Sequence, residues 1–389
     1  MVRSRRRDIA RRVSHRLSGA RIGLLTAFAS SKGGGVAQAV AAQAAMIREL
    51  GGEPLIFALD DGDRSAAVDS FAPTALELAP IVGPRVVGYA PAQLGQVLGA
   101  RLDLLHLHGI WMHPSRVGAQ WARATGGPYL ISPHGMLDPW ITARGRWKKA
   151  LARLGYERAG WARASAFHAL TADEAGDIAQ HSGRRDSIVI PNPGPAASPS
   201  PTIPRAPDLL YLGRIHPKKN LAGLIAGWRQ ARRPPAARLR LAGWGDERDV
   251  RGLRRQLEAA ADPSIDWLGP VFGEAKQRLL ETARFLILPS FSEGLPMVVL
   301  EAWAAGTPAL TSAACHLPEG FAAGAARDCG TAPEAIADAV EQALGLGDGE
   351  WLAMAAAAHG LAAGRFSAEA IAARWETAYA ALLGEGRTR

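Results

Sequence analysis

The sequence is poor in cysteine and has no long apolar run, and each absence excludes a class of protein. Only two of its 389 residues are cysteine, Cys315 and Cys329, which excludes a disulfide framework and favours a reducing compartment. No stretch approaches the roughly 18 uninterrupted apolar residues of a membrane span. Hydrophobic residues make up 48% of the chain and charged residues 21%, so a sizeable core can form. The length suits two domains better than one.

Positive charge gathers at the N-terminus, within a net charge of +9. The opening MVRSRRRDIARRVSHRLSGAR holds eight arginines and one aspartate. As a helix, it would align Ile9, Val13 and Leu17 in an apolar stripe, a pattern that favours an anionic membrane surface. A disordered basic tail, or a start codon placed too far upstream, explains it equally well. No apolar stretch follows to make an export signal, and balanced charge elsewhere argues against nucleic-acid binding. We therefore expect residues 1–20 to be a basic extension.

Short apolar runs alternate with helical patterns from residue 21 onward, which predicts parallel sheets covered by helices on both faces. The strand candidates of the first half are RIGLLTAFA, PLIFAL, RVVGYA, LDLLHLH, PYLISP, AFHAL and SIVIP. Those of the second half are LLYLGRI, RLRLAG, IDWLG, FLILPS and PALTS. Between the halves, PNPGPAASPSPTIPRAP is too rich in proline to continue either sheet. The sequence predicts two doubly wound α/β domains with Rossmann-like sheets, at 21–195 and 208–365, joined by a linker at 196–207. We expect a ligand cleft between them.

Cations follow the first strand of the second half. Arg214 and Lys219 leave the end of LLYLGRI, and Asn220 is the predicted N-cap of the next helix. Two cations beside a strand end suit a diphosphate, because a hydrogen bond to a charged group contributes about 1.5–3 kcal/mol. A solvated basic loop is the alternative.

Two acids follow in FLILPSFSEGLPMVVLEAWAAGTPALTS. Glu293 comes after a buried strand, and Gly294, Leu295 and Pro296 lead into an apolar helix with Pro296 at its first position. Glu301 lies within that helix, where a charge needs a partner. Glu293 can hold sugar hydroxyls, Glu301 ribose hydroxyls, and the helix N-terminus phosphates. The alternative is that Glu293 is an ordinary acidic residue in a turn and that Glu301 belongs to a structural ion pair.

The run SSKGGGVAQAV resembles a phosphate-binding loop, but an ATPase loop needs Ser or Thr after its glycines. This leaves Gly33, Gly34 and Gly35 as a turn that can bring backbone amides up to an anion. A turn without a ligand and a ParA-like ATPase remain alternatives. The acidic run DDGD, with Asp60, imitates a metal motif but lacks supporting ligands, so no metal site is predicted.

A basic and aromatic segment, PWITARGRWKKALARLGYERAGWARA, is typical of an amphipathic helix at a lipid interface. A solvated helix with inward-facing aromatics is an equal alternative. Its relevant residues are Trp140, Arg144, Arg146, Trp147, Lys148, Lys149, Arg153, Tyr156, Arg158, Trp161 and Arg163.

The order of these motifs, from HGIWMHPS and SPHGMLDPW through GRIHPKKN to the Glu293–x7–Glu301 spacing, resembles the retaining GT-B glycosyltransferases of the group 1 (glycosyl transferase family 4) type. ACHLPEGFAAGAA is similar to the branch that assembles exopolysaccharides and lipopolysaccharides. The chain departs from the family at PNPG, where Pro-Asn-Gly is usual.

The resemblance implies a metal-independent hexosyltransferase that uses a nucleotide-sugar such as a UDP-, GDP- or dTDP-sugar and no cofactor. Arg214 and Lys219 would neutralise the diphosphate, Glu293 would hold the sugar and Glu301 the ribose. The glycine loop would face the donor phosphates and the acceptor, and His134 would meet the transferred sugar. The helix at 366–389 would pack back on the first domain.

The acceptor would be a polysaccharide or a lipid-linked oligosaccharide, and the protein would be cytoplasmic with peripheral contact to the inner face of the membrane. A non-catalytic nucleotide-sugar-binding scaffold of the same fold remains a further alternative.

Overall fold

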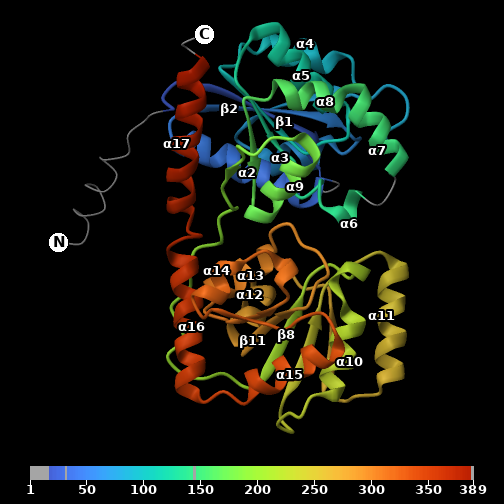
Figure 1. Ribbon diagram of the computed structural model, residues 1–389, viewed down its shortest axis with the longest axis vertical. Helices are drawn as coiled ribbons and strands as arrows, with labels where there is room; N and C mark the ends of the chain where they lie inside the picture. The colour runs from blue at the N-terminus through green and yellow to red at the C-terminus, as the bar shows by residue number, and fades with distance from the viewer. Residues whose placement is uncertain (1–16, 31–32, 143–145, 387–389) are drawn as a thin grey trace, which may run out of the picture. The chain divides into compact units, whose positions relative to one another are not determined.

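The computed structural model describes residues 17–30, 33–142 and 146–386. They form two compact units, which are described separately (Figure 1). Unit 1 comprises the described residues up to Ile190 and those from Ala372 onward, and unit 2 comprises Pro191–Ile371. Residues 191–207, between the units' sheets, contain no helix or strand.

Unit 1 is a seven-stranded parallel sheet in the order β3-β2-β1-β4-β5-β6-β7. In chain order the strands are β1 (Arg21–Phe28), β2 (Glu53–Asp60), β3 (Ala75–Pro80), β4 (Leu104–His108), β5 (Tyr129–Ser132), β6 (Ala166–Ala169) and β7 (Ile188–Val189). The helices are α2 (Gly34–Glu49), α3 (Arg64–Phe71), α4 (Ala92–Gly99), α5 (His113–Thr125), α6 (Pro139–Thr142), α7 (Arg146–Ala152), the π-helical turn η3 (Arg153–Glu157), α8 (Arg158–Arg163), α9 (Ala172–Ser182) and most of α17 (Ala368–Gly386). In Figure 1, α4, α5 and α8 lie on one side of the strands, and α2, α3 and α9 on the other.

Unit 2 is a six-stranded parallel sheet in the order β10-β9-β8-β11-β12-β13. Its strands are β8 (Asp208–Leu212), β9 (Arg238–Ala242), β10 (Ile265–Gly269), β11 (Phe285–Leu288), β12 (Ala309–Thr311) and β13 (Ala326–Asp328). Its helical elements are η4 (Pro217–Lys219), α10 (Leu221–Gln230), α11 (Glu247–Ala260), α12 (Gly273–Thr282), α13 (Met297–Ala304), η5 (Ala313–Cys315), α14 (Pro318–Ala322), α15 (Pro333–Leu344) and α16 (Asp348–Ala363). Both sheets therefore have the doubly wound arrangement that the sequence predicts.

Apolar residues at helical spacing form the buried faces of three helices. In α10, Leu221, Leu224, Ile225 and Trp228 pack into the core of unit 2. In α2, Val40, Ala44 and Ile47 are buried, whereas Val36 is only half-buried. In α17, the stripe consists of Ile371, Trp375, Tyr379 and Leu382, all at most 5% exposed.

One strand prediction is wrong. The run RVVGYA, residues 85–90, forms a turn at 85–88 and no strand, with Val86 73% exposed and Gly88 at φ +63°. The third strand of unit 1 is instead β3, and β13 was also not predicted from the sequence. Within the described ranges, every helix is too short or too polar to span a bilayer.

Candidate functional site

In unit 2 the sheet grows in opposite directions from β8 and β11, which are neighbours without being consecutive in the chain. Ligands in open α/β sheets bind beyond the carboxyl ends of strands at such a switch point. The loops after the two strands are joined there, because the Phe291 amide donates to the Lys218 carbonyl at 2.8 Å. Asn220 Nδ2 also donates to the Pro289 carbonyl, at 3.1 Å. The loops that carry the predicted cations and Glu293 therefore meet at one end of the sheet.

Lys219 and Glu293 form the central contact of this site, with Nζ 2.5 Å from Oε1. Their side chains are only 12% and 6% exposed, respectively. Ser290 donates its hydroxyl to the same Oε1 at 2.6 Å, and Lys218 Nζ lies 3.9 Å from Oε2. A carboxylate buried this deeply needs both a charge partner and hydrogen bonds, and Glu293 has both. Sequence reasoning missed Lys218 and Ser290, although both stand beside the predicted residues in the same motifs.

Arg214 follows the end of β8, and its Nη2 lies 3.1 Å from Oδ1 of Asp246. The side chains of this pair are 53% and 70% exposed, so the ion pair contributes at most about 1 kcal/mol. The Tyr211 hydroxyl donates to the Arg214 carbonyl at 2.9 Å and fixes the backbone there. The guanidinium can therefore exchange its surface partner for a bound anion at little cost. Asp246, in the motif LAGWGDE, was not predicted as a site residue.

Glu301 has a partner in Lys276 of α12, whose Nζ lies 2.7 Å from Oε1. This is the cation that a carboxylate on an apolar helix requires. The two side chains remain 23% and 32% exposed, respectively, so water and ligands can reach them. Gly294 and Leu295 lie between Glu293 and the start of α13, whose first N–H groups have no acceptor within the helix.

Two local predictions about these loops have different outcomes. Asn220 is the N-cap residue of α10, as predicted, but its side chain makes no cap hydrogen bond. It has φ +56°, and its Nδ2 donates to the carbonyls of Pro289 and Thr331. These hydrogen bonds hold the loops together. Pro296 is the N-cap of α13 rather than its first helical residue.

In unit 1 the corresponding switch point lies between β1 and β4, where the glycine loop and the loop after β4 line a pocket of about 250 Å³. Gly33 is the N-cap residue of α2, and a Cβ there would lie 2.6 Å from the Phe28 carbonyl oxygen. Gly34 has φ +52°, and Gly35 faces open space. Gly33 thus permits a close approach of α2 to β1, while the next two glycines leave the helix N-terminus open.

His134 stands beside this pocket, after β5, with a backbone φ of +55°. Its Nε2 lies 3.0 Å from Nδ1 of His108, which lines the pocket. Burial lowers the pKa of His134 to about 3, and the nearby His168 adds to the effect. The ring is therefore neutral near pH 7, and one imidazole of the pair donates to the other. His106 and His108, both on β4, are buried.

A second set of buried side chains forms a continuous hydrogen-bond chain in unit 1. It runs from the Ile190 carbonyl through His168, Ser132, His106 and Tyr379 to Gln43, with steps of 2.6–2.8 Å. Because a carbonyl only accepts, His168 Nε2 donates to Ile190, and its Nδ1 accepts from Ser132. The same reasoning makes His106 Nε2 a donor to Ser132 and Tyr379 a donor to His106. The chain thus has a single direction when its histidines are neutral, and it ties α17 and α2 to the sheet.

The basic and aromatic segment is divided among α6, α7, η3 and α8. Trp147, Leu151 and Leu154 are 66%, 62% and 69% exposed, respectively. Trp161 is buried, and Tyr156 donates its hydroxyl to the Trp111 carbonyl at 2.8 Å, so these two aromatics do not face outward. The outer face is therefore apolar at α7 and η3 but not at α8. Arg144 lies outside the described residues, as do the side chains of Trp140, Arg146 and Lys148.

The N-terminal extension, 1–20, is described only from Leu17, which is buried. In the acidic run DDGD, Asp60 pairs with Arg64 at 2.7 Å, and the hydrogen bond from Arg64 holds its pKa below the usual range. Asp61 accepts a hydrogen bond from Ser30. In the part of the chain that the structure describes, no group of three or more His, Cys, Asp or Glu is placed to hold a metal ion.

Comparisons with known proteins match each unit separately. The model of a glycosyl transferase 4-like domain matches residues 34–193, and the model of glycosyl transferases group 1 matches residues 206–345. Anabaena HepE, solved in complex with UDP and glucose, superposes with a TM-score of 0.73 at 18% identity, over 93% of this chain and 100% of HepE. At that identity the likeness shows the fold.

Two curated relatives are similar in sequence. O-antigen chain mannosyltransferase B of Escherichia coli is 35% identical over 116 residues, which cover 28% of this chain and 29% of the relative. D-inositol 3-phosphate glycosyltransferase of Frankia alni is 29% identical over 325 residues, which cover 72% of this chain and 79% of the relative. Each unit therefore matches a glycosyltransferase domain model, and both units are doubly wound parallel sheets, which together make up the GT-B fold.

Proposed function

We propose that the chain is a hexosyltransferase that moves a sugar from a nucleotide-sugar to a saccharide acceptor with retention of the anomeric configuration. The observation that carries this proposal is the contact between Lys219 and Glu293 at the switch point of unit 2, with the exposed guanidinium of Arg214 on the adjoining loop. Two cations suit a diphosphate, and a fixed carboxylate suits sugar hydroxyls. The complex of HepE with UDP and glucose supports a nucleotide-sugar as the donor.

In this proposal the protein catalyses transfer mainly by positioning and electrostatic stabilisation. The bond from the anomeric carbon to the diphosphate breaks on the face that the acceptor hydroxyl attacks, and the hydroxyl proton passes to the leaving diphosphate. Arg214, Lys219 and the N-terminus of α13 stabilise the charge that develops on that group. In this role they take the place of the metal ion that stabilises the diphosphate charge in other transferases. Glu293 serves no nucleophilic role in this proposal, because attack on the same face forms no bond between the sugar and the protein.

The remaining predicted residues have supporting roles. Glu301 binds the donor ribose, exchanging part of its contact with Lys276 for the hydroxyls. The glycine loop, Gly33 to Gly35, presents the N-terminus of α2 to an anion. His134 contributes a neutral imidazole to the transferred sugar, and His108 fixes its orientation.

The acceptor in this proposal is a polysaccharide or a lipid-linked oligosaccharide of the bacterial cell surface, which the similarity to an O-antigen mannosyltransferase supports. The exposed Trp147, Leu151 and Leu154, among basic residues, would bring the protein to the inner face of the membrane. Each basic residue near an anionic surface contributes about 1 kcal/mol. Sedimentation with anionic vesicles tests this contact. Binding should weaken as salt is raised, and binding that is indifferent to salt would contradict it.

A donor panel tests the proposed activity. UDP-, GDP-, ADP- and dTDP-sugars are screened by thermal shift, and those that stabilise the chain are assayed for sugar transfer. Nuclear magnetic resonance of the product then reads the anomeric configuration. Transfer with retention from one class of donor is the expected result. Inversion would refute the stereochemical part, and no transfer from any donor would favour the scaffold.

The same assay separates the ATPase alternative. The residues after the glycines, Val36, Ala37 and Gln38, offer no hydroxyl for a metal ion, so we expect no ATP hydrolysis that depends on Lys32. ATP turnover that is lost in Lys32→Ala, without sugar transfer, would support that alternative.

A further inference from the structure

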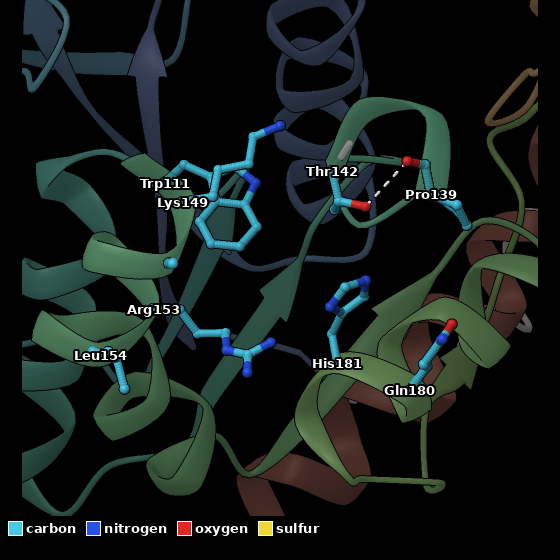
Figure 2. Close-up of a pocket in the computed structure, with 9 residues that line it drawn as sticks. Trp111, Pro139, Thr142, Lys149, Arg153, Leu154, Gln180 and His181 are labelled. Atoms are coloured by element: carbon cyan, nitrogen blue, oxygen red, sulfur yellow. Dashed lines mark hydrogen bonds between the residues drawn. The ribbon is translucent and has the colours of Figure 1, made fainter. Parts of the chain in front are cut away.

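A second pocket of unit 1, with a volume of about 500 Å³, lies between the loop after β4, the α7–η3 segment and α9 (Figure 2). Trp111, Lys149 and Arg153 line one side, and Gln180 and His181 of α9 line the other. Its volume is within the range of about 300–1,000 Å³ typical of small-molecule sites. Of its lining residues, only Leu154 has a role assigned above, in the proposed membrane contact.

Trp111 is held in a fixed conformation by hydrogen bonds from its backbone and its side chain. It has φ +77°, a conformation that a tryptophan adopts only at a cost in free energy. Its amide donates to the buried Glu157 at 2.6 Å, its carbonyl accepts from Tyr156, and its Nε1 donates to the Met136 carbonyl at 3.2 Å. Three hydrogen bonds, one of them to a buried carboxylate, therefore fix an indole that lines a pocket. A fixed aromatic side chain offers a binding surface with little entropy left to lose.

The charge of the pocket has one sign. Lys149 and Arg153 are its ionised lining residues, and no acid lines it among the described residues. Thr142 and Gln180 add neutral polar groups, with the Thr142 hydroxyl donating to the Pro139 carbonyl at 3.2 Å (Figure 2). An aromatic wall, two cations and a few neutral donors match a ring that carries an anionic substituent.

We propose that this pocket binds an anionic sugar residue, either a uronic acid or a sugar phosphate, with the ring packed on Trp111 and the anion paired with Arg153. It rests on the proposed function only in taking that sugar to be part of the acceptor. The carboxylate and the phosphate share the chemistry that the cations recognise, and the choice between them is made by experiment.

The test is calorimetric titration of the full chain with four probes. They are methyl β-glucuronide, glucose 1-phosphate, the neutral methyl β-glucoside and inorganic phosphate. An anionic sugar should bind about 10-fold or more tightly than the neutral one, because a charged hydrogen bond is gained. It should also bind more tightly than inorganic phosphate, which has no ring to pack on Trp111. Whichever anionic sugar binds more tightly identifies the substituent.

Variants assign the binding to the pocket. Arg153→Gln and Trp111→Gly should each weaken it about 10-fold or more. Glycine accepts the positive φ at position 111, so the second change removes the indole without adding backbone strain. The matched control is Arg158→Gln, which removes an exposed arginine five residues further on and outside the pocket. It should leave the affinity within about 2-fold, a change well below the worth of one charged hydrogen bond.

Equal loss in the control, no loss in Arg153→Gln, or no preference for an anionic sugar would each overturn the proposal. Arg153 is exposed, so this arm stands even where Trp111→Gly fails to fold. Transfer activity separates this proposal from the proposed function. Pocket binding without transfer from any nucleotide-sugar would refute the function alone. Transfer with unchanged acceptor affinity in both variants would refute the pocket alone.

Discussion

At the scale of single residues, Glu293 depends on Lys219 for its burial. Removing one partner of a buried pair leaves an uncompensated charge and costs about 3–5 kcal/mol. We predict that Lys219→Met lowers the free energy of unfolding by an amount in that range, softened by Lys218 at 3.9 Å. The double variant Lys219→Met/Glu293→Gln should regain most of this loss because the buried charge is gone. Urea unfolding measures both changes, and a double variant as unstable as the single one would contradict the pairing.

A second prediction at this scale separates the three glycines of the loop. Gly33→Ala should destabilise unit 1, because the new Cβ would lie 2.6 Å from a backbone oxygen that cannot move aside cheaply. Gly35 has open space around it, so Gly35→Ala should change the free energy of unfolding by no more than an ordinary surface substitution does, about 0.5 kcal/mol. Thermal unfolding of the two variants makes the comparison. If both behave alike, the close approach at Gly33 is wrong.

Residue types could be read from the sequence, but their partners could not. The motifs point to Lys219, Glu293 and Glu301, yet nothing in the order of residues pairs Glu301 with Lys276, 25 positions away and on another helix. Asn220 shows the same limit. An Asn before a helix is usually a cap, and only the packing of two loops diverts its amide to other carbonyls.

At the scale of elements, the hydrogen-bond chain and the His108–His134 pair make unit 1 sensitive to acid. Burial lowers the pKa values of all four histidines, to about 3 for His134 and about 4 for His168. Below about pH 6.5 the unfolded chain therefore binds protons that the folded chain does not. Stability should fall as the pH drops from 6.5 toward 4, by up to about 1.4 kcal/mol per pH unit for each histidine.

Unfolding in urea at pH 7 and at pH 5 measures this slope. His168→Gln provides the comparison. Because it removes one titrating group, it should reduce the slope of the free energy of unfolding against pH by the contribution of one histidine. A stability that is flat between pH 7 and pH 5 would show that these histidines are not held neutral in the folded chain.

The elements themselves were largely predictable, and the exceptions have physical causes. Continuous apolar runs identified the central strands because both faces of a parallel sheet are buried. RVVGYA was mistaken for a strand because valine and tyrosine have high β-propensity. Gly88 at φ +63° turns the chain there, and the valines face outward. The strand β3 (ALELAP) lies at the sheet edge, and its sequence gives a weak strand signal because alanine, glutamate and proline have low β-propensity.

At the scale of the whole molecule, each unit has the same strand order around its switch point, and four of the predicted residues lie at these two places. Gly33 and His134 flank the pocket of unit 1, and Lys219 and Glu293 meet in unit 2. Local sequence predicted the fold class because alternating strands and helices allow few topologies. The pocket lined by Trp111 was not predictable, since three segments distant in sequence build it.

The central claim is that the switch point of unit 2 binds the diphosphate of a nucleotide-sugar. Its most direct test is kcat/KM for donor turnover in Arg214→Gln beside Asp246→Asn. Both changes remove the same exposed ion pair, so neither should affect folding, but only the first removes the cation. The account predicts a loss of about 10-fold or more in Arg214→Gln, from one charged hydrogen bond, and little loss in Asp246→Asn. Equal rates in the two variants would contradict it.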